Sequence, residues 1–350
     1  MSTRFRARGR AVAAIAVTSL LVLSACGGDD DDAGGGGGGG EQTLNIVGFA
    51  VPEEANNAIY EKFKETDAGA DAAGEPEGSY GASGDQSRAV EGGLEADYVH
   101  FSIEPDVTRL VESGQVAEDW NQNDTDGIVS RSVVVFVVEE GNPLGIETWD
   151  DLLQDDVEII TPNPGSSGAA KWNILAAYGQ AIAGGASEDE AKQYLTDFVG
   201  NVAALPGSGR DATTAFKDGT GNVLISYENE AILARQSGEA FDYVVPDTTL
   251  LIENPGAILE DADPIAQPWL DFVLSDEGQT EFVKKGFRPV IDDLEIPEVE
   301  GANDPADPFP TPGTLLTVGE AFGGWSEANA FFDEEDGFVT AILQESGKAE

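Results

Sequence analysis

One segment near the middle of the chain constrains the fold more than any other. Residues 158–173 read EIITPNPGSSGAAKWN. This order predicts a buried strand, a proline-braced turn, two serine hydroxyls, a run of small residues and then a helix. A helix start leaves backbone N–H groups without intrahelical partners at the positive end of the helix dipole. The segment therefore predicts a site for a small anion that needs no formal positive charge.

Two further segments, Tyr80 to Gln86 and Gly207 to Thr213, have a similar make-up. The plainer interpretation of any one such loop is a turn followed by a helix N-cap. Three loops that converged on one point would instead hold a tetrahedral oxyanion. The sequence therefore predicts an anion site only if these segments meet in the fold.

The first 25 residues are typical of a secretory signal. Four arginines precede an apolar stretch, Ala11 to Val22, which is too short to span a bilayer. The following Leu23-Ser24-Ala25-Cys26 resembles a bacterial lipobox, and this implies cleavage before Cys26 and lipidation of its thiol. An ordinary secretory signal with a chance cysteine is the alternative. Residues 26–40, Cys26 and then Gly and Asp with one Ala, predict a flexible tether.

The chain is strongly acidic. It carries 66 acidic and 18 basic residues, a formal net charge of −48. Nucleic acid is excluded as a partner, because backbone binding needs clustered Lys and Arg. The acid excess is typical of a solvated surface suited to high external salt, where repulsion is screened. An acidic face made for a cationic ligand is the alternative.

No catalytic or metal motif stands out. His100 is the sole histidine, no GxSxG motif accompanies it, and Cys26 is the only thiol. A Ser-His-Asp triad, a zinc or copper site and a phosphate-loop lysine motif therefore lack their residues. We expect a protein that is not an enzyme and needs no metal or cofactor.

Strands and helices alternate along the body of the chain. The apolar patterns predict strands at 44–48, 98–101, 132–138, 157–161, 223–227, 243–245 and 250–252, and helices at 53–66, 187–198, 229–235, 265–274, 277–285 and 318–344. Repeated β–α order indicates parallel sheets covered by helices, which is the α/β class.

Six blocks spread over this body carry a family resemblance. They are YGASGDQ at 80–86, residues 160–173, SGR at 208–210, NVLISYENEA at 222–231, GFRP at 286–289 and FGGW at 322–325. With them the chain resembles the periplasmic sulfate-binding proteins, the solute receptors of sulfate or thiosulfate ABC importers. The resemblance implies a two-lobed periplasmic-binding-protein (type II) fold, in which two parallel-rich sheets are joined by two crossover strands. It implies lobe 1 at 41–127 plus 247–350 and lobe 2 at 128–246.

The resemblance also implies the ligand-binding atoms. By position the donors are Ala50, Ser83, Ser167, Gly168, Ala169, Gly209 and Tyr227. Ser167 would give its hydroxyl, Tyr227 its phenol O–H, and the others backbone N–H groups. Sulfate is a dianion without a proton near neutral pH, so donor-only surroundings suit it. A phosphate site would include an acceptor for the ligand's own proton.

Some charged and substituted positions leave questions open. The family commonly has Asp where Ala50 stands and Trp where Tyr227 stands, and a tyrosine hydroxyl can accept as well as donate. Sulfate and thiosulfate therefore both remain candidates. Lys171 and Arg210 follow two of the loops, where each would either offset the anion's charge without touching it or form a surface ion pair. Strand alternation should turn Glu228 away from the ligand.

The function implied is that of an extracytoplasmic solute-binding lipoprotein. It would be a monomer, held at the membrane by its lipid anchor only, that delivers sulfate or thiosulfate to an ABC permease with its ATPase. Two alternatives stay open. One is an acidic surface lipoprotein that uses a two-lobe fold for adhesion or sensing, and the other is a receptor for another oxyanion such as molybdate or phosphate.

Overall fold

The computed structural model describes residues 42–72, 74–333 and 335–348. Within these ranges, no helix is long and apolar enough to cross a membrane. The predicted signal at 1–25, the lipidation site Cys26 and the tether at 26–40 lie outside the described residues, and stay predictions.

The described chain alternates strands and helices as the sequence predicts. The strands are β1 Asn45–Phe49, β2 Glu77–Gly81, β3 Tyr98–His100, β4 Ile128–Glu139, β5 Ile159–Ile160, β6 Val202–Ala204, β7 Val223–Tyr227, β8 Phe241–Val244, β9 Thr248–Ile258 and β10 Thr314–Leu316. The helices are α1 Glu53–Phe63, α2 Ser83–Glu91, α3 Glu104–Glu112, α4 Gly168–Ala183, α5 Glu188–Gly200, α6 Gly209–Lys217, α7 Glu228–Gln236, α8 Ala266–Val273, α9 Asp276–Lys284, α10 Val318–Phe322, α11 Trp325–Ala330 and α12 Phe338–Glu345, with a 3-10 turn at Trp149–Leu153.

The strands form one continuous hydrogen-bonded sheet in the order β2-β1-β3-β9-β4-β7-β5-β6, with β10 beside β9 and β8 beside β4. Parallel pairs lie toward both ends of this order, β1 with β2 and β3, and β5 with β6 and β7. The long strands β4 and β9 lie in the middle of the order, between the two groups of parallel strands, where the resemblance implied two crossover strands. The expected two sheets are hydrogen-bonded into one because these crossovers pair with each other, antiparallel, from Ile128 to Val133.

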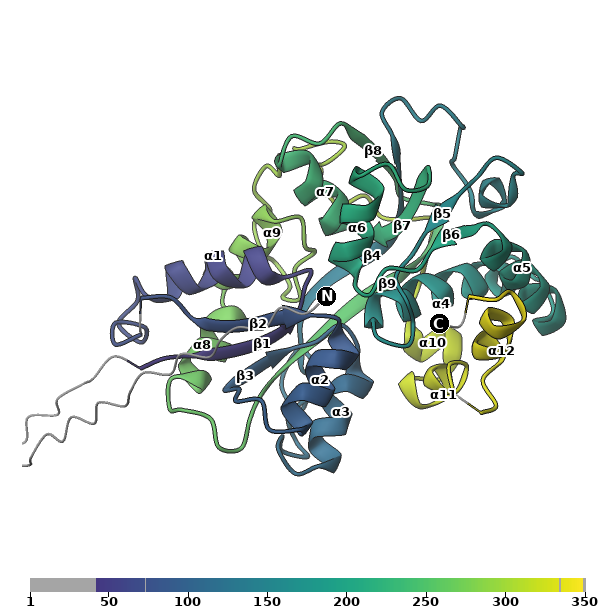
Figure 1. Cartoon of the computed structure of the whole chain (residues 1–350). Helices are drawn as coiled ribbons and strands as arrows, with labels where there is room; N and C mark the ends of the chain where they lie inside the picture. Colours follow the sequence, from purple (N-terminus) through teal and green to yellow (C-terminus); the bar gives the residue numbers. More distant parts are fainter. Residues whose placement is uncertain (1–41, 73, 334, 349–350) are drawn as a thin grey trace, which may run out of the picture. The chain divides into compact units, whose positions relative to one another are not determined.

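Helices cover both faces at each end of the sheet (Figure 1). At the β1 end, α1, α8 and α9 pack together, and α2 packs on α3 on the other side. At the β5 end, α4 packs on α5 while α6 and α7 lie against β7 and β4. Because helices cover both faces of the sheet, strand β4 is buried on both sides, and Val133 to Phe136 are fully buried. A near-continuous apolar sequence is typical of such a strand.

The C-terminal region differs from the sequence prediction in two ways. The single helical stretch expected at 318–344 is three helices, α10, α11 and α12. Between α10 and α11, Gly323 and Gly324 adopt φ of 80° and 110°, which interrupt a right-handed helix. These helices also pack on α4, where Trp325 meets Trp172 edge-on at 4.8 Å between ring centroids and Phe338 lies 5.3 Å from Tyr178. The implied boundary gave all of 247–350 to lobe 1, yet these contacts tie 318–345 to the half of the sheet assigned to lobe 2.

Candidate oxyanion site

The start of α4 presents three unpaired donors. Ser167 is the N-cap residue with an extended backbone, φ −108° and ψ 121°, and the helix begins at Gly168. Among the described residues, nothing accepts from the N–H groups of Gly168 and Ala169, and the Ser167 hydroxyl has no partner. The adjacent Ser166 differs, because its hydroxyl donates to the Gly207 carbonyl at 2.8 Å. The local sequence thus builds an anion-ready helix start, as predicted.

The start of α6 lies beside that of α4. Ser208 caps α6 by accepting from the Asp211 N–H at 3.1 Å, and the Gly209 N–H has no acceptor in the described part of the chain. A Cβ placed on Gly209 would lie 3.4 Å from the Cβ of Ala169 and 3.2 Å from Val51. Glycine therefore lets this backbone approach both α4 and the loop after β1.

The start of α2 completes the convergence. The Gly84 N–H donates to the Ser166 carbonyl at 3.0 Å, which joins α2 directly to the loop before α4. The Ser83 hydroxyl is already used, because it donates to Asp106 Oδ2 at 2.6 Å and accepts from the Ser102 N–H at 2.9 Å. The Ser83 N–H, by contrast, has no partner among the residues described. Only the amide of Ser83 is thus free for a ligand.

Ala50 follows β1 at the same edge of the sheet. Its N–H donates to the Gly81 carbonyl at 2.8 Å, so this predicted donor is occupied here. Ala50 lies next to Val51, whose side chain faces Gly209. Ala50 is in the predicted place. Its role as a ligand donor stays a prediction, because its N–H would have to leave the Gly81 carbonyl or bind it and the ligand together.

Tyr227 ends β7 and is the N-cap residue of α7. Its side chain is 1 % exposed, and its hydroxyl lies 2.8 Å from the Ser102 hydroxyl. Burial raises the pKa of the Tyr227 phenol, so the group keeps its proton at neutral pH. Tyr227 is therefore a neutral hydroxyl that reaches across to the segment after β3.

The two neighbouring cations are held by other groups. Lys171 Nζ donates to Asn329 Oδ1 at 2.6 Å, and burial lowers the pKa of this amine. Arg210 makes a two-bond contact with Glu230, with Nε 3.1 Å and Nη2 2.9 Å from the carboxylate oxygens, and Nη2 also donates to the Val51 carbonyl at 3.2 Å. Arg210 is therefore paired with a carboxylate, whereas Lys171 is hydrogen-bonded to a neutral amide.

A buried carboxyl lies behind the α2 start. Asp106 is 4 % exposed, and burial raises the pKa of its carboxyl, against the Ser83 hydrogen bond and the charge of Lys171. Glu228, by contrast, is buried and pairs with Arg288. It is the first residue of α7 and not part of β7, so the predicted strand alternation does not apply to it. Burial likewise raises the pKa of Glu228, opposed by Arg288.

Sequence reasoning missed Ser102 and Asn254. Ser102 is fully buried after β3, and its carbonyl accepts from Trp172 Nε1 at 2.8 Å and from Asn254 Nδ2 at 2.9 Å. A Cβ on Gly168 would lie 2.7 Å from the Ser102 hydroxyl oxygen. The one local signal was position, because Ser102 follows a strand at the edge where parallel strands place their carboxyl ends.

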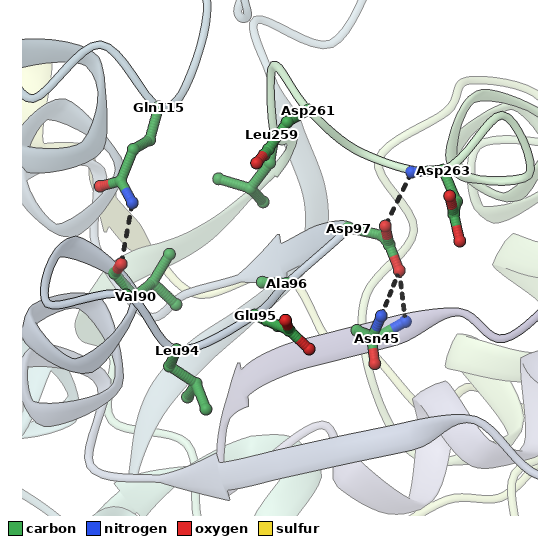
Figure 2. Close-up of a pocket in the computed structure, with 11 residues that line it drawn as sticks. Asn45, Val90, Leu94, Glu95, Ala96, Asp97, Gln115, Leu259, Asp261 and Asp263 are labelled. Atoms are coloured by element: carbon green, nitrogen blue, oxygen red, sulfur yellow. Dashed lines mark hydrogen bonds between the residues drawn. The ribbon is translucent and has the colours of Figure 1, made fainter.

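An acidic pocket lies elsewhere. A cavity of about 360 Å³ at the other end of β1 is lined by Glu95, Asp97, Asp261 and Asp263, with no Lys or Arg among its lining residues. Figure 2 shows Asp97 between Asn45 and Asp263, and it accepts three hydrogen bonds from them. Within the described ranges, no group of three or more His, Cys, Asp or Glu could hold a metal ion. This cavity would repel an anion.

Comparison with known proteins places these features in a family. A family model described as a bacterial extracellular solute-binding protein matches residues 44–288. A sulfate-binding protein of Synechococcus elongatus is 35% identical over 342 residues, covering 95% of both chains. The thiosulfate-binding protein of Pseudomonas aeruginosa is 33% identical over 258 residues, covering 71% of this chain and 75% of that protein.

Solved structures agree on the fold. The sulfate-binding protein SubI from Mycobacterium tuberculosis is 41% identical and superposes with a TM-score of 0.76, covering 82% of this chain and 98% of SubI. A periplasmic thiamin binding protein gives a TM-score of 0.66 at 14% identity, covering 87% of this chain and 96% of that one, which is a likeness of fold alone. The predicted α/β fold of two-lobed periplasmic binding proteins is thereby confirmed.

Proposed function

The chain belongs to the bacterial extracellular solute-binding proteins, and on that premise we propose that it captures sulfate outside the cytoplasm for delivery to an ABC importer. The observation that carries the proposal is the meeting of three helix starts, α2, α4 and α6, whose first amides have no partner in the described structure. The sulfate- and thiosulfate-binding relatives support the same ligand class.

The donor set suits a fully ionised oxyanion. The amides of Ser83, Gly168, Ala169 and Gly209 and the hydroxyl of Ser167 all donate, and a sulfate ion offers only acceptors. The nearest carboxylates are satisfied by other groups, Asp106 by Ser83 and Glu230 by Arg210. Selection against a protonated oxyanion would follow from the absence of a free carboxylate at the helix starts.

Capture would be coupled to closure of the two halves of the fold. Donors come from both sides, with Ser83 on α2 beside β1 and Ser167 on α4 beside β7. A ligand that touches both sides favours the closed form, because only that form makes every contact. The hydrogen bonds from Gly84 to Ser166 and from Trp172 to Ser102 would join the two halves in the closed form.

The remaining assignments belong to the same proposal. The protein would act as a lipid-anchored monomer, with Cys26 as the lipidated residue and 26–40 as the tether, and would present its closed form to a permease and its ATPase. The lobes would comprise 41–127 plus the chain from 247 to about Gly313, and 128–246 together with the helices α10–α12. It would perform no catalysis.

Isothermal titration of the full chain with sulfate, thiosulfate, molybdate and phosphate tests the proposal. We expect tight binding of sulfate, with thiosulfate as the second candidate because the Tyr227 hydroxyl can accept as well as donate. Ser167→Asp should abolish binding, because it places a carboxylate among the donors. Sulfate binding that survives in this variant, or a native chain that binds only phosphate, would overturn the assignment.

A further inference from the structure

We propose that Ser102 is a ligand-facing residue and that Ser102 and Tyr227 act as one shared donor in which either hydroxyl can replace the other. This inference rests on the proposed function and specifies how the anion is held at the α7 side of the site.

Ser102 touches three of the five segments that supply predicted donors. Its N–H donates to the Ser83 hydroxyl at 2.9 Å, its hydroxyl lies 2.8 Å from the Tyr227 hydroxyl, and that hydroxyl oxygen lies 2.7 Å from where a Gly168 side chain would begin. Gly168 carries one of the free amides of α4. The Ser102 hydroxyl therefore lies next to the unpaired donors and not in a remote part of the core.

The backbone of Ser102 is fixed by bonds that leave the hydroxyl its own role. Trp172 Nε1 and Asn254 Nδ2 both donate to the Ser102 carbonyl. Asn254 Oδ1 is in turn used by the Ser130 hydroxyl, at 3.3 Å. Both polar backbone atoms of Ser102 thus have partners, so its hydroxyl is not needed to hold the backbone in place.

A count of protons shows what the pair can do. Two hydroxyls carry two protons, and their mutual bond uses one of them. If Tyr227 donates to Ser102, the Ser102 proton is left over, and if Ser102 donates to Tyr227, the phenol proton is left over. Burial keeps the phenol protonated, so one proton always remains. Gly168, which carries one of the free amides, lies beside Ser102, and an anion bound there would accept that proton.

The two possible donor oxygens lie 2.8 Å apart. A single rotation of each hydroxyl moves the donor from one oxygen to the other without moving the backbone. The pair would therefore serve tetrahedral oxyanions of different size, and sulfate and thiosulfate would be accepted by the same site with different members of the pair donating.

A double-mutant cycle tests the shared donor. Titration of the full chain with sodium sulfate and with sodium thiosulfate would compare the native protein, Ser102→Ala, Tyr227→Phe and the double variant. Each single variant keeps one hydroxyl and should lose less than about 5-fold in affinity, whereas the double variant should lose about 10- to 150-fold, the range for a hydrogen bond to a charged group. Ser132→Ala removes another fully buried serine hydroxyl, which accepts from the Asn229 N–H, and should change affinity by less than about 2-fold.

The outcomes separate this inference from the proposed function. If the fold-losses of affinity in the two single variants multiply to give the loss in the double variant, the shared donor is overturned. The proposed function, sulfate binding by the native chain, would still stand. A native chain that binds neither anion would overturn the proposed function and this inference with it. If the double variant does not fold, Ser102→Cys with Tyr227→Phe keeps the side-chain volume and replaces the hydroxyl by a weak donor. The same excess loss is then expected, and its absence would contradict the proposal.

Discussion

The side chains of Arg288 and Glu228 form a buried ion pair, with Arg288 Nε 2.7 Å from Glu228 Oε2 and Nη2 3.1 Å from Oε1. Glu228 is fully buried at the start of α7, while Arg288 follows α9 and also exchanges two backbone hydrogen bonds with Arg131 of β4. The pair thus ties the chain after α9 to a crossover strand and to the helix that follows Tyr227.

Replacing Arg288 by Met should destabilise the fold by about 3–5 kcal/mol, because Glu228 would remain buried without its partner. Urea unfolding followed by circular dichroism measures the change. Lys284→Met is the matched control, since its pair with Glu281 is largely exposed on the lysine side and should contribute less than about 1 kcal/mol. Adding Glu228→Gln to Arg288→Met should restore part of the loss, and no recovery would argue against an uncompensated charge as the cause.

Ser167→Ala should weaken sulfate binding by about 10- to 150-fold, because it removes a free hydroxyl that would donate to a charged ligand. Ser166→Ala is the control at the next position, where the hydroxyl is already bonded to the Gly207 carbonyl. Calorimetry should find Ser166→Ala within a few-fold of native. Equal losses in the two variants would indicate that the loop is perturbed as a whole.

Gly168→Ala should hinder closure, because its Cβ would lie 2.7 Å from the Cβ and hydroxyl oxygen of Ser102. Overpacking of this kind costs about 1–3 kcal/mol, which corresponds to roughly 5- to 150-fold in sulfate affinity if the clash exists only in the closed form. Small-angle scattering with and without sulfate would follow closure. Gly200→Ala, where a Cβ would meet nothing within 4 Å, should compact on sulfate like the native chain.

His100 should stay neutral far below its ordinary titration range. It is fully buried, its ring nitrogens lie 3.2 Å from Asn56 Oδ1 and 3.1 Å from the Ser130 hydroxyl, and burial lowers its pKa from 6.5 to about 3. Below pH 6.5 the unfolded chain binds a proton at His100 that the folded protein does not bind. The free energy of unfolding should therefore be unaffected by this group above pH 6.5 and should fall by roughly 1.4 kcal/mol per pH unit as the pH drops toward 3.

The chain has a single histidine, so its NMR signal needs no assignment. The ring Cε1–H shift of labelled protein should not move between pH 8 and 5. A titration midpoint near 6.5 in the folded protein would contradict a buried neutral ring.

Association with sulfate should speed up as salt rises. The chain carries a formal net charge of −48, and its field repels an anion until salt screens it. Stopped-flow tryptophan fluorescence at low and at molar potassium chloride measures the rate constant. A rate that fell with added salt would point to a local positive field that outweighs the net charge at the site.

Much of the fold follows from local patterns in the sequence. The strand predicted at 132–138 lies within β4, and the helix predicted at 187–198 is α5, which begins with a capping box of Ser187 and Glu190. Strand β2 was missed because Glu77–Gly81 has two glycines and no apolar run, so its pairing with β1 decides its structure. The break between α10 and α11 was missed because helical periodicity does not reveal that Gly323 and Gly324 adopt positive φ.

The site was predictable where it depends on chain-local geometry. A helix start leaves its first amides without intrahelical partners, and a Gly/Ser turn before it marks the place in the sequence. The first amides of α4 and α6 are free in this way. Contacts between distant segments were not predictable. The bond from Ser102 to Tyr227 joins residues 125 positions apart, and the Ala50 N–H is occupied by Gly81, a partner from the missed strand.

Strand β4 changes partner between consecutive residues, since Val133 faces Leu251 of β9 and Val134 faces Tyr227 of β7. Tyr227 lies at this junction. A rotation of the two halves about it would therefore displace Tyr227 very little, while residues far from the junction would move further. Under the proposed closure, the Tyr227 hydroxyl would therefore keep its position while the starts of α2, α4 and α6 change theirs.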